Sequence, residues 1–106
     1  MPIMDLTREM FDRRILENKE PALVDFRADW CGHCRTIAPA VEQIGRENPA
    51  LLVAGVDVDA CQELARTYGV GSIPTLIAFR DGRAAGRLTG PGSVDEIRAL
   101  VRAHLL

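Results

Sequence analysis

Runs of consecutive apolar residues mark the strands that this chain is expected to form. They cover 22–27, 51–57 and 76–80. Runs of this length without alternation are typical of strands that are covered on both faces. Residues 3–6 could add a short edge strand, and Asp81–Gly82 is the signal of a two-residue hairpin that would pair 76–79 with 84–88. The pattern therefore predicts five strands, of which the last two are antiparallel.

Apolar residues at helical spacing fill the segments between these runs and the segment after the last of them. The expected helices begin at or near Thr7, Cys34, Asp59 and Ser93. Thr7 is a suitable N-cap, while Asp59 to Gln62 and Ser93 to Glu96 have the form of capping boxes. The pattern therefore predicts four helices.

The order of these elements predicts the fold class. Strands alternate with helices in the first part of the chain, and a hairpin followed by a helix ends it. That order indicates an α/β fold, a mixed five-stranded sheet flanked by four helices on its two faces. A chain of 106 residues can bury one modest core, so we expect a single domain spanning residues 1–106.

Composition and charge narrow the class of function. The net charge is −2, and the basic residues are interspersed with acidic ones. Without a basic stripe, neither nucleic acid nor an anionic membrane is expected as a partner. No apolar run approaches membrane-spanning length and the first residues lack the features of a signal peptide, so the expected location is the cytoplasm. Three cysteines, an odd number, suit a reducing compartment with one functional pair and one spare.

The functional pair is expected at Cys31 and Cys34. Their spacing at the start of a helix puts the two sulfurs one turn apart, close enough for a disulfide and beside unpaired backbone N–H groups. Because a helix N-terminus stabilises negative charge, Cys31 is the candidate nucleophile. Its attack on a substrate disulfide would give a mixed disulfide, which Cys34 could then resolve. The pair therefore predicts a redox site for thiol–disulfide exchange.

The residues around this pair resemble the active-site segment of the thioredoxin family. The segment 24–39 carries Ala28-Asp29-Trp30 directly before Cys31, and Ile73-Pro74-Thr75 and Gly90 follow in matching order. The resemblance covers essentially the whole chain and implies the thioredoxin fold. It also implies a cis bond between Ile73 and Pro74 that faces the cysteines.

The resemblance further implies an activity and its partners. It indicates a protein-disulfide reductase that acts on disulfide-containing proteins and receives electrons from a thioredoxin reductase, an enzyme that uses flavin and NADPH. The groove for a flexible substrate segment would be formed by Trp30, Gly32, Ile73, Pro74 and Gly90. The protein itself is expected to be a monomer without a bound cofactor.

Asp25 interrupts the apolar run 22–27 and has two interpretations. The residues alone allow a buried carboxylate that relays protons to and from Cys34, or a carboxylate that reaches water at the end of the strand. The resemblance favours the first interpretation, which would make Asp25 a third catalytic residue.

Gly32 and His33 lie between the cysteines and are expected to tune the site. Thioredoxins most often have proline at the His33 position, whereas Cys-Gly-His-Cys resembles the domains of protein disulfide isomerases. A charged His33 would stabilise the Cys31 thiolate and raise the reduction potential. The potentials of the two families differ by about 90 mV. Oxidation or isomerisation of substrate disulfides therefore stays open as the alternative activity.

Three further positions bear on the resemblance. Arg27 stands where thioredoxins usually carry tryptophan, and Gly55 stands where many carry a lysine beside the buried aspartate. Asp25 is therefore expected to lack that charge partner and to have a higher pKa. Some thioredoxins form a second disulfide from the position of Cys61, but the partner cysteine is absent here, so we expect no redox role for Cys61. A disulfide between two molecules through Cys61 stays open as the alternative, because the number of cysteines is odd.

Metal binding is the competing class of function. Cys31 and Cys34 would supply half of a zinc site, but a closed site needs four ligands. The remaining candidates, which lack paired spacing, are His33, Cys61 and His104. A metal-binding or interaction module is therefore the weaker hypothesis.

Overall fold

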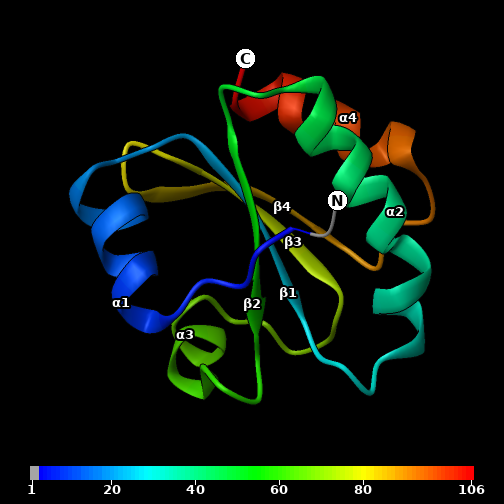
Figure 1. Ribbon diagram of the computed structural model, residues 1–106, viewed down its shortest axis with the longest axis horizontal. Helices are drawn as coiled ribbons and strands as arrows, with labels where there is room; N and C mark the ends of the chain where they lie inside the picture. The colour runs from blue at the N-terminus through cyan, green and yellow to red at the C-terminus, as the bar shows by residue number, and fades with distance from the viewer. Residues whose placement is uncertain (1–2) are drawn as a thin grey trace.

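The computed structural model describes residues 3–106 as a sheet between two layers of helices (Figure 1). The strands are β1 (Ala22–Arg27), β2 (Leu52–Asp57), β3 (Thr75–Arg80) and β4 (Arg83–Thr89). The helices are α1 (Arg8–Phe11), which continues as the π-helix η1 (Asp12–Glu17), α2 (Gly32–Glu47), α3 (Gln62–Thr67) and α4 (Val94–His104). None of these helices combines the length and the apolar character that spanning a membrane requires.

The strands form a mixed sheet in the order β2-β1-β3-β4. β1 is parallel to β2 and antiparallel to β3, while β3 and β4 form the predicted hairpin. β1 is therefore a central strand, which explains why its apolar run does not alternate with polar residues. In this register Asp25 lies between Gly55 on β2 and Leu76 on β3.

The prediction of a fifth strand at residues 3–6 is wrong. Within this segment Asp5 makes a single parallel bridge to Gly55. Two backbone hydrogen bonds of 2.7 and 2.8 Å, one on each side of Asp5, form the bridge. Thr7 then caps α1, and the chain turns away from the sheet before further pairs can form. The sheet within residues 3–106 thus has four strands rather than five.

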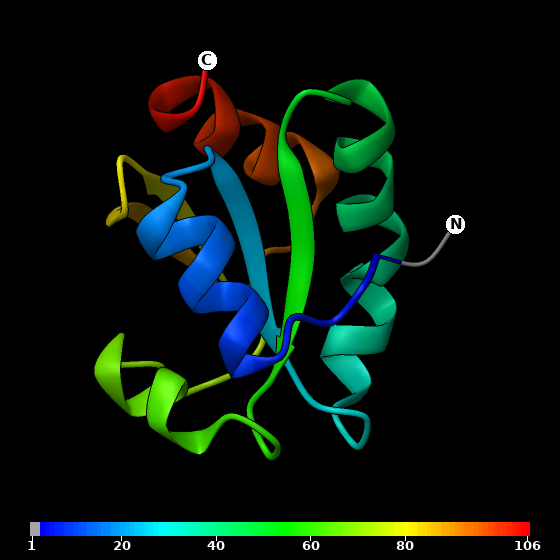
Figure 2. The ribbon, with the colours of Figure 1, turned by 60° about the vertical axis from the view of Figure 1, so that its left-hand side comes forward.

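The two faces of the sheet bury different sets of apolar side chains. α1, η1 and α3 cover the face of Val24 and Phe26, whereas α2 and α4 cover the face of Leu23 (Figure 2). Successive side chains of a strand point to opposite faces, which explains this division. The buried residues of α2 are Cys34, Ile37, Val41 and Ile44. The stripe that packs α2 on the sheet therefore includes the second cysteine of the pair.

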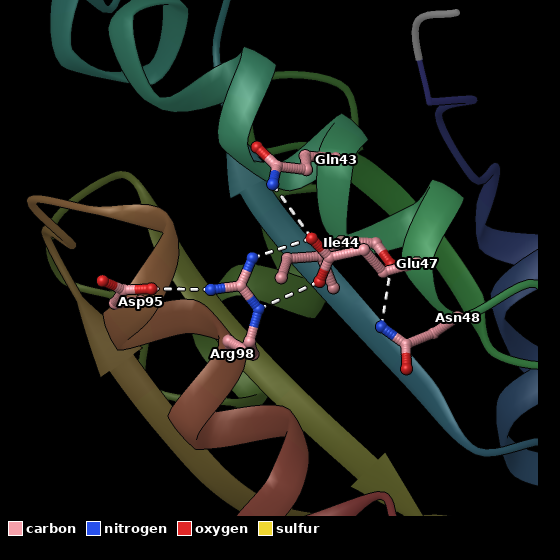
Figure 3. A network of polar contacts seen from close by, with 6 residues as sticks. All are labelled: Gln43, Ile44, Glu47, Asn48, Asp95 and Arg98. Atoms are coloured by element: carbon pink, nitrogen blue, oxygen red, sulfur yellow. Dashed lines mark hydrogen bonds and ion pairs between the residues drawn. The ribbon is translucent and has the colours of Figure 1, made fainter.

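Polar contacts fasten α2 to α4 at the surface (Figure 3). The Arg98 guanidinium donates to both carboxylate oxygens of Glu47, at 3.0 and 2.7 Å, and to Asp95 at 2.6 Å. Gln43 also donates to Glu47, at 2.9 Å. The hydrogen bonds from Arg98 and Gln43 lower the pKa of Glu47 to about 2. The helix that carries the cysteines is thereby tied to the C-terminal helix.

The helix predicted near Asp59 is present as α3, but the prediction that Asp59 caps it is wrong. α3 begins after Cys61, whose side chain makes no capping hydrogen bond. Asp59 lies in the preceding turn, where its N–H donates to the Asp57 carboxylate at 2.9 Å and its own carboxylate accepts from Trp30 at 2.7 Å. The side chain that would cap the helix is therefore already engaged with a residue far away in the sequence.

Candidate active site

The two cysteines lie at the first turn of α2. Cys31 is the N-cap residue, and its Sγ accepts a hydrogen bond from the Cys34 N–H at 3.2 Å. The two sulfurs are joined in a disulfide, with the Cα atoms 5.2 Å apart. Cys31 is 7% exposed and Cys34 is 3% exposed, so the first cysteine is slightly more accessible than the second. The geometry that the spacing predicts is thus present.

A short turn brings the chain from the end of β1 to Cys31. The Cys31 N–H donates to the Ala28 carbonyl at 3.2 Å, and Arg35 reaches back from α2 to donate to the Asp29 carbonyl at 2.6 Å. Gly32 is exposed, and the nearest side-chain atom that a Cβ there would meet is Arg35 Nη2, at 3.9 Å. The outer side of the pair is therefore open to an approaching chain.

The Ile73–Pro74 peptide bond is cis, as the resemblance implies. The Ile73 carbonyl oxygen lies 3.9 Å from Cys31 Sγ, so this loop faces the cysteine pair. Gly90 donates its N–H to the Pro74 carbonyl at 2.8 Å and ties the loop to the end of β4. Gly90 has a φ of +60°, a conformation that favours glycine.

A shallow pocket of about 380 Å³ opens beside Cys31. Its lining residues are Trp30, Cys31, Val58, Val70, Gly71, Ser72 and Ile73. Trp30 is 68% exposed, and its Nε1 donates to the Asp59 carboxylate at 2.7 Å. The sequence predicts Trp30 and Ile73 in this groove. It does not predict Val58 or Val70 in the groove, or the Asp59 carboxylate that binds Trp30, because no local motif marks them.

His33 and Gly90 lie close together outside this pocket, while Pro74 is buried. The His33 Nε2 donates to the Pro91 carbonyl at 2.9 Å, since a carbonyl oxygen can only accept. A Cβ on Gly90 would lie 3.7 Å from His33 Cε1. The imidazole is therefore packed on the loop that follows β4, and Nε2 carries a proton in this arrangement.

Asp25 is completely buried, at 0% exposure. Neither carboxylate oxygen has a hydrogen-bond partner within the part of the chain that the structure describes. Burial raises the pKa of Asp25 from its ordinary 3.8 to about 6; the positive charge of Arg27 opposes this rise, and the negative charge of Asp5 adds to it. The interpretation in which Asp25 reaches water at the end of the strand is therefore wrong.

Asp25 and Cys34 lie at the same interface between the sheet and α2. Asp25 and Leu23 project from the same face of β1, and Leu23 packs in the cluster that contains Ile37 of α2. Cys34 belongs to the same buried stripe, one turn before Ile37. After a short turn α2 runs back along β1, so its first turn lies near the C-terminal end of this strand (Figure 2).

Arg27 occupies the space that Gly55 leaves open. A Cβ on Gly55 would lie 2.7 Å from Arg27 Nε and 2.6 Å from Asp5 Oδ1. Arg27 donates to Asp5 from Nε at 3.2 Å and from Nη2 at 2.9 Å. The expectation of a raised pKa for Asp25 is therefore confirmed, although Arg27 supplies a positive charge in place of the absent lysine and offsets part of the rise.

Cys61, the third cysteine, lies apart from the pair. It is partly buried at the start of α3 and forms no disulfide. Burial raises the pKa of its thiol, and the nearby Asp57 adds to the effect, so the thiolate is disfavoured. Within residues 3–106 no three His, Cys, Asp or Glu side chains are grouped in a way that could hold a metal ion.

Comparisons with known proteins agree with this geometry. The family model described as Thioredoxin matches residues 2–103. The thioredoxin of Mycobacterium tuberculosis is 45% identical over 86 residues, which cover 80% of this chain and 74% of that protein. A bifunctional thioredoxin reductase/thioredoxin of Mycobacterium leprae is 42% identical over 88 residues, which cover 82% of this chain and 19% of that protein. A solved structure of a mutant thioredoxin from Halobacterium salinarum has a TM-score of 0.86 and 32% identity, and the match covers 99% of this chain and 91% of that one. The expected α/β fold is therefore confirmed, with the strand count corrected to four.

Proposed function

Because this chain belongs to the thioredoxin family and carries a redox-active cysteine pair, it is a thiol–disulfide oxidoreductase that reduces protein disulfides, and we propose how its residues divide the reaction. In the reduced protein, the Cys31 thiolate attacks one sulfur of a substrate disulfide. The other substrate sulfur leaves as a thiolate and takes up a proton, and a mixed disulfide joins the substrate to Cys31. Cys34 then loses its proton and attacks the Cys31 sulfur. This step releases the second substrate thiol and leaves the disulfide between Cys31 and Cys34.

The position of the Cys31 sulfur at the N-terminus of α2 carries this proposal. The Sγ accepts the Cys34 N–H at 3.2 Å, and the orphan N–H groups and dipole of a 16-residue helix favour negative charge at that point. Cysteines in such positions are typically ionised at neutral pH and act as nucleophiles. Cys34 lies inside the first turn and is less exposed, which suits the second, intramolecular attack.

Asp25 is the group that we propose to take the proton from Cys34. A carboxyl group with a pKa of about 6 is mostly ionised at neutral pH, yet it binds a proton more readily than an ordinary carboxylate. Its oxygens have no hydrogen-bond partner among the described residues, so their lone pairs are available. Transfer to this carboxylate, directly or through one water, would activate Cys34 at the moment of its attack.

The apolar pocket beside Cys31 suits an extended segment of the substrate protein. The backbone before Pro74 faces the pair, and backbone groups in such a position can pair with an incoming strand. Trp30 and Ile73 would contact the side chains next to the substrate cysteine, while Gly32 and Gly90 leave room for the substrate backbone. Flexible segments of disulfide-containing proteins are therefore the proposed substrates.

A thioredoxin reductase that uses flavin and NADPH is the proposed electron donor, since the sequence has no nucleotide-binding signature of its own. The relative from Mycobacterium leprae, which is named as both thioredoxin reductase and thioredoxin, supports this partnership. We further propose that the protein is a monomer that works in the cytoplasm, where a reducing environment would keep Cys61 as a free thiol.

His33 supports one alternative, in which the protein oxidises or isomerises substrate disulfides. The imidazole is held beside the pair by its bond to Pro91 and, when charged, would stabilise the reduced form. Equilibration with glutathione decides the direction. A reduction potential of about −270 mV for the cysteine pair supports the reductase, and one of about −180 mV supports the alternative.

Single cysteine variants test the division of roles. Cys31→Ser should abolish the reduction of insulin disulfides with dithiothreitol as electron source, and Cys34→Ser should accumulate a mixed disulfide with a disulfide-containing peptide. Cys61→Ser removes a cysteine outside the pair, so it is the matched control and should keep wild-type activity. Full activity in Cys31→Ser, or a mixed disulfide formed through Cys34 in the wild-type protein, would overturn the assignment.

A further inference from the structure

Three residues from separate segments meet beside the buried Asp25. Asp5, Arg27 and Gly55 together form the Arg27 cluster. Gly55 is the register partner of Asp25 on β2, and Asp5 bridges to Gly55 from the other side. Arg27 follows Asp25 on β1 at the next position that projects from the same face. Strand register and alternation therefore bring the cluster to the carboxylate.

Gly55 is the residue that lets the guanidinium lie against the sheet. A Cβ at this position would lie 2.7 Å from Arg27 Nε, 2.8 Å from Arg27 Cζ and 2.6 Å from Asp5 Oδ1. These separations are shorter than non-bonded atoms tolerate, so any larger residue would displace Arg27, Asp5 or both. The position of the positive charge therefore depends on a glycine at residue 55.

Hydrogen bonds hold the Arg27 guanidinium in this place. It donates to Asp5 Oδ1 from Nε at 3.2 Å and from Nη2 at 2.9 Å, and Nη2 also donates to the Ile3 carbonyl at 3.4 Å. These charge-assisted bonds converge on one carboxylate oxygen and anchor the guanidinium beside Asp5. The charge is thus held against the sheet instead of moving freely in water.

Within residues 3–106, the other elements on this face of the sheet bring no further positive charge to Asp25. Its register partners, Gly55 on β2 and Leu76 on β3, are uncharged. The residues that α2 and α4 bury are uncharged as well. Among the charged groups of residues 3–106, Arg27 lowers the pKa of Asp25 and Asp5 raises it, against the larger effect of burial. Arg27 is therefore the residue that offsets part of the burial effect.

We propose that Arg27 is a positioning residue for the proton on Asp25. The guanidinium, laid over Gly55 and held by Asp5, stabilises the carboxylate form of Asp25 and keeps it ready to accept the Cys34 proton at neutral pH. Arg27 acts through Asp25 and not on the reacting sulfurs. This inference rests on the proposed role of Asp25 in the resolution of the mixed disulfide.

The direct test is a pH titration of the Asp25 carboxyl carbon by NMR in the oxidised protein. Arg27→Met keeps an unbranched, flexible side chain but removes the charge, and should raise the pKa of Asp25 by about 1. Gly55→Ala should raise it as well, because the new Cβ displaces the guanidinium. Asp5→Asn removes a repulsive charge and should lower the pKa of Asp25. Arg27→Lys keeps a positive charge and should restore most of the wild-type value.

Arg87→Met is the matched control. Arg87 on β4 lies opposite Ile77 on β3. Its guanidinium donates to the Tyr68 and Gly69 carbonyls on the face of the sheet that is turned away from Asp25. Its loss removes the same charge and should leave the pKa of Asp25 unchanged.

A merely structural role would move the pKa of Asp25 in the same direction in Arg27→Met and Asp5→Asn, whereas the proposal requires opposite directions. An unchanged pKa in Arg27→Met, an equal change in Arg87→Met or a rise in Asp5→Asn would overturn it. If Arg27→Met does not fold, Asp5→Asn and Arg27→Lys still decide.

The rate at which Cys34 resolves the mixed disulfide is the second readout. In Arg27→Met, the pH at which this rate reaches half its maximum should move upward together with the pKa of Asp25, and Arg27→Lys should reverse the change. Asp25→Asn tests the underlying role separately. If that variant keeps the wild-type rate and pH profile, the proposed function of Asp25 is wrong, whereas the NMR titration still reports whether Arg27 acts on its pKa.

Discussion

Replacement of Asp25 by asparagine should change the stability of the oxidised protein in a pH-dependent way, with the variant gaining on the wild type as the pH rises from acid to neutral. The pKa of Asp25 is about 6 in the folded protein, above the ordinary value of 3.8 that applies to the unfolded chain. The folded state therefore binds this proton more tightly. The stability that the protonated group contributes is complete below pH 3.8 and is lost as the pH rises through about 6. A pKa difference of about 2 corresponds to about 3 kcal/mol of unfolding free energy.

Asparagine has nearly the size of aspartate and cannot ionise. The variant therefore lacks the free-energy cost of ionising a buried carboxyl group, which grows as the pH rises. A buried amide without partners has a cost of its own, about 1–3 kcal/mol, but that cost does not vary with pH. The pH dependence of the difference between the two proteins therefore carries the test, and not its size at a single pH. Between pH 4 and pH 8, the free energy of unfolding of the variant should rise by about 2–3 kcal/mol relative to that of the wild type.

Urea unfolding of both oxidised proteins at several values between pH 4 and pH 8 measures this difference. Asp25→Leu is a second variant without a titrating group, and it should show the same dependence on pH with a different constant offset. A difference that stays constant across this range, or that shrinks toward pH 8, would refute the argument that burial raises the pKa of Asp25.

Removal of the Arg98 guanidinium should make the fold more sensitive to acid. Because hydrogen bonds lower the pKa of Glu47 from 4.5 to about 2, their stabilising effect is present above pH 4.5 and is lost as the pH falls through about 2. Arg98→Met should therefore raise the pH midpoint of acid unfolding followed by circular dichroism, and an unchanged midpoint would contradict this. Asp59→Ala should free the Trp30 indole that it now holds at 2.7 Å and raise KM for a disulfide peptide several-fold with little change in kcat; an unchanged KM would count against a role for Trp30 in binding. Ser93→Ala should lower the free energy of unfolding in urea by about 1 kcal/mol, since Ser93 Oγ caps α4 through a 3.3 Å bond, and Ser93→Thr should keep most of it.

Most elements of the fold could be predicted from the sequence because their causes are local. The apolar run of β1 and the Asp81–Gly82 hairpin depend on residues that are neighbours in the chain, and both appear at the predicted positions. The predicted strand at residues 3–6 failed because a strand also needs a partner along its length. There the chain makes one bridge and then enters α1.

The surroundings of the site could be predicted only in part. Trp30 and Ile73 were marked by motifs, but the Asp59 carboxylate that holds the indole lies 29 positions from Trp30. The same is true of Arg27 and Asp5, which are 22 positions apart and meet over a glycine. In the sequence, Gly55 indicates only that the lysine of other thioredoxins is missing next to Asp25. In the fold, the same glycine makes room for the charge of Arg27.

The sequence by itself determined the reactive pair of this protein, because the spacing of Cys31 and Cys34 and the start of α2 between them depend on one turn of helix. The tertiary structure decided the electrostatic environment of Asp25. Burial, and the charges of Arg27 and Asp5, act through distances in space, and these distances are set by the register of β1 on β2 and by the bridge at Gly55.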